Sequence, residues 1–203
     1  MAKIATLDDL IDYCEKEAEK LPDCVDEVLL KRAGLPWPRV AAVSRVHALP
    51  EVYESVIRTL DIFGVSIGYF ALWPCSSRDR DLADAILESN EDTAPPTLVA
   101  RQRGLIIVGA DEADLVAVGT RDSDTPDKVF RIEFCTAPGV RVSEVAPNFL
   151  VFMMLAGNLH ALTVSDDATA EVAAGEMASR CQELGCSAEQ AAFWILRSRH
   201  LAS

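Results

Sequence analysis

Three closely spaced runs of aliphatic and β-branched residues constrain the fold of this chain more than any other feature. They cover Leu105–Val108, Leu115–Gly119 and Lys128–Cys135, and short polar turns join them. Parallel neighbours would need crossover connections of a dozen or more residues, so links of this length favour antiparallel hairpins. Further strand-like runs at Val65–Trp73 and Val140–Val142 extend the pattern. The sequence therefore predicts an antiparallel sheet.

Segments with helical spacing of apolar residues surround these strands, which makes the predicted fold class α+β. Helices are expected at residues 7–21, 26–33 and 79–90, from Pro50 toward Gly64, from Pro147 to Leu162, between Asp167 and Gly185, and from Ser187 to His200. Thr6 with Asp9 and Ser187 with Gln190 are typical helix-starting pairs. Leu35–Pro38 is expected to be extended, because proline disfavours helical geometry in the residue before it. Residues 91–96 are expected to form a loop.

Composition narrows the classes of partner. The net charge is −13, with 32 acidic and 19 basic residues, so the surface should repel nucleic acids and anionic lipids and attract basic proteins. The six cysteines lack C-x-x-C spacing and no signal peptide is evident, which favours a cytoplasmic protein with reduced thiols. The apolar stretch Phe149–Leu162 is shorter than the ~18 residues of a membrane span. Gly157, Asn158 and His160 interrupt it, so we interpret it as a buried core helix.

Catalytic and ligand-binding motifs are weak. Residues 64–68 match the G-x-S-x-G pattern of hydrolases, but the predicted order is helix then strand, the reverse of what that chemistry requires. Asp122, Asp124 and Asp127 are spaced roughly as in a calcium loop, yet Asp127 replaces the required glycine. The three histidines are scattered, and glycine patterns for nucleotides are absent. We expect no catalytic residue, no metal and no cofactor.

Acidic residues at predicted loop ends are the candidate partner-binding residues. Asp111, Glu112 and Asp114 cluster at one turn, where they are expected to be exposed and to pair with lysine or arginine of a partner. An ordinary solvated turn is the alternative interpretation, and acid–base catalysis or binding of a divalent ion is a more distant one. Trp73 would be the aromatic anchor of the interface. The candidate residues are Trp73, Asp79, Asp81, Asp111, Glu112 and Asp114.

Residues 49–162 resemble the SUKH superfamily of Smi/Knr-like regulators and bacterial immunity proteins. The resemblance depends on the order and spacing of four segments, LPEVY at Leu49–Tyr53, LIIVGADEADLVAV at Leu105–Val118, KVFRI at Lys128–Ile132 and VAPNFLVF at Val145–Phe152. The family often carries Gly-Asp in its central hairpin, where this chain has Ala113-Asp114, so it resembles a divergent member. The resemblance implies a bent antiparallel sheet of about four to six strands with helices packed around it.

We expect residues 1–163 to form this α+β domain and residues 164–203 to form a C-terminal helical extension packed on it. The resemblance implies a non-enzymatic protein-binding module, and more specifically an immunity protein that neutralises a basic toxin domain. One alternative is a cellular regulator or scaffold whose tail, residues 166–203, is a docking element that could be removed without unfolding the domain. Another alternative is an enzyme or small-molecule binder that uses the carboxylates near Asp111 together with Trp73.

Overall fold

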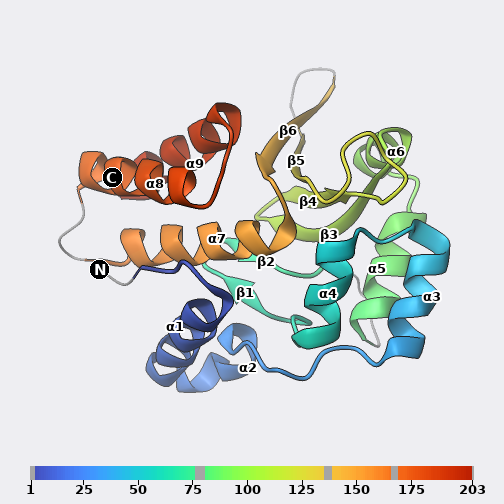
Figure 1. Ribbon diagram of the computed structural model, residues 1–203, viewed down its shortest axis with the longest axis horizontal. Coiled ribbons are helices and arrows are strands. Elements are labelled where there is room, and N and C mark those ends of the chain that lie inside the picture. Colours follow the sequence, from blue (N-terminus) through green and yellow to red (C-terminus); the bar gives the residue numbers. More distant parts are fainter. Residues whose placement is uncertain (1–2, 76–80, 135–138, 166–168, 203) are drawn as a thin grey trace.

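The computed structural model describes residues 3–75, 81–134, 139–165 and 169–202. Its described strands form one six-stranded antiparallel sheet in the order β1-β2-β3-β4-β5-β6, and helices pack around this sheet (Figure 1). The predicted α+β fold with a bent antiparallel sheet is therefore confirmed. The strands are β1 Ser66–Ile67, β2 Phe70–Ala71, β3 Leu105–Asp111, β4 Asp114–Gly119, β5 Val129–Phe134 and β6 Val140–Ala146.

The helices lie on both faces of the sheet and at its ends. They are α1 Leu7–Lys20, a 3₁₀ turn Pro22–Cys24, α2 Val25–Val28, α3 Trp37–His47, α4 Glu51–Thr59, α5 Leu82–Glu91, α6 Pro95–Gln102, α7 Phe149–Thr163, α8 Ala170–Glu183 and α9 Ala188–Leu201. The predicted capping pairs are confirmed, because Thr6 with Asp9 begins α1 and Ser187 with Gln190 begins α9 through reciprocal bonds.

Two helices were missed, and both begin at prolines. α3 has Pro38 in its first turn and α6 begins with Pro95-Pro96. Leu35–Pro38 was predicted to be extended and residues 91–96 to form a loop, and no structure was predicted for the rest of either helix. Proline is accepted in a first helical turn, because the backbone N–H groups there have no partner within the helix. The helix predicted at residues 26–33 is wrong, because only the turn Val25–Val28 is helical and Lys31 instead forms a β-bridge with Asp61.

The strand predicted at Val65–Trp73 is also wrong. It is a hairpin of two short strands, β1 and β2, with Gly68 in the left-handed region at φ 58° between them. This φ value favours glycine, which explains why the chain reverses there. The hairpin covers only the last part of β3, because Phe70 and Ala71 pair with Asp111 and Ala110.

Each face of the sheet packs on a separate cluster. Ile106, Val108, Val116 and Val118 belong to the main core with the side chains of α7. The opposite face, with Leu105, Ile107, Ala117 and Ile132, forms a smaller cluster with Ala100 of α6. This alternation follows from the two-residue period of a strand. α7 crosses the middle of the molecule, with α1 and α2 on one side and α8 and α9 on the other (Figure 1).

A buried amide completes the part of β3 that β2 leaves unpaired. The Asn90 side chain of α5 accepts from the Ile107 N–H at 2.8 Å and donates to the Ile107 carbonyl at 2.9 Å. It therefore replaces a neighbouring strand for one residue, and both backbone groups of Ile107 are paired at the edge of β3.

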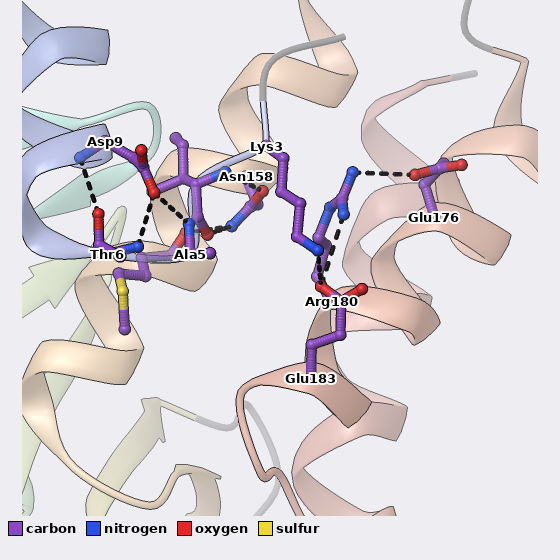
Figure 2. A network of polar contacts seen from close by, with 10 residues as sticks. Lys3, Ala5, Thr6, Asp9, Asn158, Glu176, Arg180 and Glu183 are labelled. Carbon is purple, nitrogen blue, oxygen red and sulfur yellow. Dashed lines mark hydrogen bonds and ion pairs between the residues drawn. The ribbon is translucent and has the colours of Figure 1, made fainter.

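The three residues that interrupt the apolar α7 all face the N-terminal segment. Asn158 accepts from the Ile4 N–H and donates to the Ile4 carbonyl, at 3.2 and 2.7 Å. His160 contacts the Tyr13 hydroxyl through Nδ1 at 2.7 Å. A Cβ at Gly157 would lie 2.7 Å from Leu10 Cδ1, so glycine permits close packing there. Figure 2 shows Asn158 beside the segment that leads into Thr6. It also shows Lys3 paired with Glu183 of α8, and Arg180 of the same helix paired with Glu183 and Glu176.

The C-terminal helices share the core of the sheet. α8 and α9 contact α7, and α9 also contacts β6. Trp194 of α9 is 0% exposed, packs against Phe70 and Phe152, and donates its indole N–H to the Val145 carbonyl at 2.7 Å. Val145 is the unpaired residue at the bulge of β6, so the indole satisfies a carbonyl that the sheet does not use. These contacts lead us to expect that removal of residues 166–203 would unfold the domain, in contrast to the docking-tail alternative.

Candidate functional site

The β3–β4 turn holds the acidic residues that the sequence analysis selected. Asp111 ends β3, Asp114 begins β4, and Glu112 lies between them with φ 54°. The Asp111 carboxylate is 0% exposed and that of Asp114 is 15% exposed, whereas Glu112 remains 61% exposed. The expectation that all three carboxylates would be exposed is therefore wrong for Asp111 and Asp114.

Two arginines of the same chain bury these carboxylates. Arg131 of β5 forms ion pairs with Asp111 at 2.7 Å and with Glu133 at 2.5 Å, and a third with Asp114. Arg197 of α9 pairs with Asp111 at 2.7 Å and with Glu112 at 3.2 Å. The charges of Asp111 and Asp114, which were predicted to bind cations of a partner, are thus already paired within the molecule, whereas Glu112 also remains accessible to solvent.

Aromatic rings lie over both guanidinium groups. Arg131 lies 5.7 Å from the Phe193 ring centroid and Arg197 lies 5.7 Å from that of Tyr69. The face of each ring attracts the cation. Burial raises the pKa of Asp111 above its ordinary value, against the lowering effect of Arg197 and Arg131. The two permanent cations favour the ionised form of Asp111 at neutral pH.

An acidic cleft adjoins this network. It has a volume of about 680 Å³ and lies between α5, α6 and the β3–β4 turn. Its acidic lining residues are Glu88, Glu91, Asp92, Glu112 and Asp114, and none of the described residues that line it is lysine, arginine or histidine. We call this surface the acidic cleft. Such a lining favours a positively charged ligand.

The acidic cleft also has an apolar wall. Phe134, at the end of β5, is 54% exposed and lines it together with Leu115, Pro96 and Pro74. The Asp114 carboxylate accepts a hydrogen bond from the Phe134 N–H at 2.9 Å, which ties the end of β5 to the turn. A basic group with an apolar neighbour would therefore match both parts of the lining.

Trp73 and Asp111 do not line the acidic cleft. Trp73 packs edge-on against Phe63, with ring centroids 5.1 Å apart, as a half-buried part of the core. Glu112 and Asp114 are the only candidates from the sequence that the acidic cleft brings together among its described lining residues. Neither the acidic cleft nor two smaller pockets among the described residues are lined by Trp73 or Asp111, the residues that the small-molecule alternative placed together.

Asp81 has a structural position and Asp79 lies outside the described residues. The Asp81 side chain caps α5 by accepting from the Asp84 N–H at 2.9 Å, and it binds Arg39 of α3 at 2.6 and 2.7 Å. The bonds from Arg39 hold the pKa of Asp81 below its usual value. Asp81 therefore joins α3 to α5, and its charge is matched within the chain.

The weaker motifs have structural roles where they are described. Ser66 of the G-x-S-x-G pattern lies in β1, after the helix and not before one. Asp127 has φ 65° and accepts from the Val52 N–H at 2.9 Å, so it satisfies the N-terminal turn of α4. Among the described residues, no helix has the length and apolar character to cross a bilayer.

Comparison with known proteins adds no identification, because no family model, curated protein or solved structure matches this chain. The acidic cleft itself contains residues that sequence reasoning missed. Glu91 and Asp92 fall in a segment predicted to be a simple loop, and Phe134 was expected only as part of a strand. These residues come together only in the folded chain, where α5 and β5 both border the acidic cleft, so no local sequence pattern could indicate them.

Proposed function

We propose that this chain is a non-enzymatic protein-binding module whose acidic cleft receives basic side chains of a partner protein. The observation that carries the proposal is the convergence of acidic residues in one cleft with no basic residue among its described lining, where Glu91 and Glu112 are exposed although Asp114 is paired with Arg131. Lysine and arginine side chains fit such a lining, and the net charge of −13 would accelerate their approach.

The apolar wall suggests how the interaction gains strength beyond charge. Phe134 is an exposed aromatic residue at the rim of the acidic cleft, and aromatic residues of this kind often dominate the binding energy of interfaces. We propose that the partner presents a lysine or arginine beside an apolar side chain. The basic group would meet Glu91 and Glu112, and the apolar group would cover Phe134.

Within this class, we propose an immunity-type role, in which the partner is a toxin domain with a basic active site. Two features support this role. The SUKH resemblance includes Leu105–Val118, the segment that forms β3 and β4 and supplies Glu112 and Asp114 to the acidic cleft. Many members of that superfamily neutralise toxins, often nucleases. A nuclease binds the phosphates of its substrate through lysine and arginine side chains, and carboxylates of an inhibitor can pair with those side chains instead.

The experiment measures binding to a toxin encoded beside this chain in its native host. The cleft variant Glu91→Lys/Glu112→Lys changes two exposed carboxylates of the acidic cleft. The control variant Glu15→Lys/Glu19→Lys makes the same charge change on the exposed side of α1. We expect the cleft variant to raise Kd at least about tenfold, which corresponds to about 1.4 kcal/mol of binding free energy. The control should change Kd less than about twofold.

The outcomes separate the parts of the proposal. Equal losses in the two variants would mean that only net charge matters and that the acidic cleft is not the binding surface. Unchanged binding in both variants would also show that the acidic cleft is not part of the interface. If no neighbouring toxin binds wild-type protein at low salt, the immunity role is wrong.

A further inference from the structure

The turn between α8 and α9 brings two cysteines together. The Cys186 N–H donates to the Cys181 carbonyl at 2.9 Å, and the Gly185 N–H donates to the Gln182 carbonyl at 3.2 Å. Gly185 has φ 74°, so the turn is a Schellman motif, in which the side chains at the two outer positions meet. Cys181 and Cys186 occupy those positions. A pair of apolar side chains usually fills them, so thiols are not needed for the turn itself.

The two thiols lie in different environments. Cys181 is 0% exposed within the main core, whereas Cys186 is half-buried and packs against that core. The proximity of the two thiols raises the pKa of the Cys181 thiol and, against the effect of burial, lowers the pKa of the Cys186 thiol. An accessible thiol of lowered pKa beside a second thiol is the arrangement of peroxide-reactive cysteine pairs.

We propose that Cys186 and Cys181 form a peroxide-sensitive pair, in which Cys186 is oxidised first and Cys181 then closes a disulfide. The oxidant is hydrogen peroxide. In the first step the Cys186 thiolate attacks one peroxide oxygen, the O–O bond breaks, and hydroxide leaves and takes up a proton to form water. In the second step Cys181 sulfur attacks the sulfenic acid, the S–O bond breaks, and the thiol proton leaves with the oxygen as a second water. The two thiols lose two electrons, which reduce the peroxide.

The disulfide would connect the end of α8 directly to the start of α9. Cys186 immediately precedes Ser187, the N-cap of α9, and α9 carries Trp194 and Arg197 into the core and the ion-pair network. Oxidation would therefore fix the position of the first turn of α9 relative to the last turn of α8. The proposal is independent of the acidic cleft and of any partner.

The test uses the full chain and hydrogen peroxide. After oxidation, remaining thiols are blocked with an alkylating reagent and the chain is cleaved with trypsin. Cys181 and Cys186 share the peptide that follows Arg180 and ends at Arg197. We expect this peptide to lose two hydrogen atoms and escape alkylation at peroxide concentrations that leave the exposed Cys24 and Cys75 alkylated. The proposal is overturned if this peptide keeps two alkylatable thiols after Cys24 or Cys75 has reacted.

Variants separate the two roles. Cys181→Ala should leave a sulfenic acid on Cys186, which a 1,3-dicarbonyl reagent captures, because the resolving thiol is gone. Cys186→Ser should leave Cys181 unreactive because it is buried. Cys24→Ser is the control and should form the disulfide as wild type does. Capture of sulfenic acid on Cys181 in preference to Cys186 would reverse the assignment, and the wild-type peptide measurement stands if a variant fails to fold.

Discussion

The carboxylate of Asp111 and the guanidinium of Arg197 lie 2.7 Å apart, although 86 residues separate them in the sequence. Arg131 approaches the other carboxylate oxygen at 2.7 Å, so one buried anion joins β3, β5 and α9. Since the Asp111 side chain is 0% exposed, its charge is tolerable only while both cations stay in place.

Substitution of Asp111 by asparagine should destabilise the fold. The change removes the anion and leaves Arg131 and Arg197 partly buried without it. We expect the free energy of unfolding to fall by about 3 kcal/mol, measured by denaturant titration. Glu112→Gln is the control, because that carboxylate is 61% exposed and its loss should cost less than about 0.5 kcal/mol. Equal effects of the two substitutions would contradict the role assigned to Asp111.

Substitution of Asn90 by leucine should also destabilise the fold. Leucine cannot bond the Ile107 N–H and carbonyl, which would remain buried and unpaired at the edge of β3. We expect a loss of about 2–4 kcal/mol in the free energy of unfolding, because each unpaired group costs about 1–3 kcal/mol. The buried hydroxyl of the neighbouring Ser89 has no hydrogen-bond partner among the described residues, so Ser89→Ala should be neutral or stabilising. A similar loss in both variants would argue against the bridging role of Asn90.

The C-terminal helices should be required for folding. Trp194→Ala would open a cavity beside Phe70 and Phe152 and is expected to cost about 3–5 kcal/mol. Deletion of residues 166–203 should abolish cooperative thermal unfolding, because it removes Trp194 and Arg197 together. Leu196→Ala is the control, since this α9 side chain is 57% exposed. A deletion variant that unfolds cooperatively near the wild-type temperature would show that the tail is dispensable.

Acidification should weaken the fold through His160. Burial lowers the pKa of His160 below its ordinary value of 6.5, so the unfolded chain binds a proton that the folded chain resists. The free energy of unfolding should therefore decrease as pH falls through 6.5. The negative charge of Glu17 favours protonation of the His160 ring and the positive charge of Lys20 opposes it.

The measurement compares denaturant titrations at about pH 7.5 and about pH 5.5. His160→Asn should reduce the pH dependence, and part should remain because burial also lowers the pKa of His47. His200→Asn on the exposed face of α9 is the control. A pH dependence unchanged by His160→Asn would contradict the assignment.

Local chemistry predicted much of the fold. The capping pairs Thr6–Asp9 and Ser187–Gln190, the short turns between β3, β4 and β5, and the apolar run of α7 all reflect interactions between residues close in sequence. Such interactions depend on spacing, so the residue order determined them. The two helices that begin at prolines were missed because proline allows both a helix start and an extended segment, and packing decides between them.

The candidate site depended on tertiary structure. The residue order placed Asp111, Glu112 and Asp114 at a turn, where a polar cluster is exposed by default. Only the return of β5 and α9 brought Arg131 and Arg197 to that turn, where they bury Asp111 and partly bury Asp114. The acidic cleft likewise formed where α5 and β5 placed Glu91 and Phe134 beside Glu112. Burial and charge pairing depend on which segments meet in space, so the sequence pattern alone could not determine them.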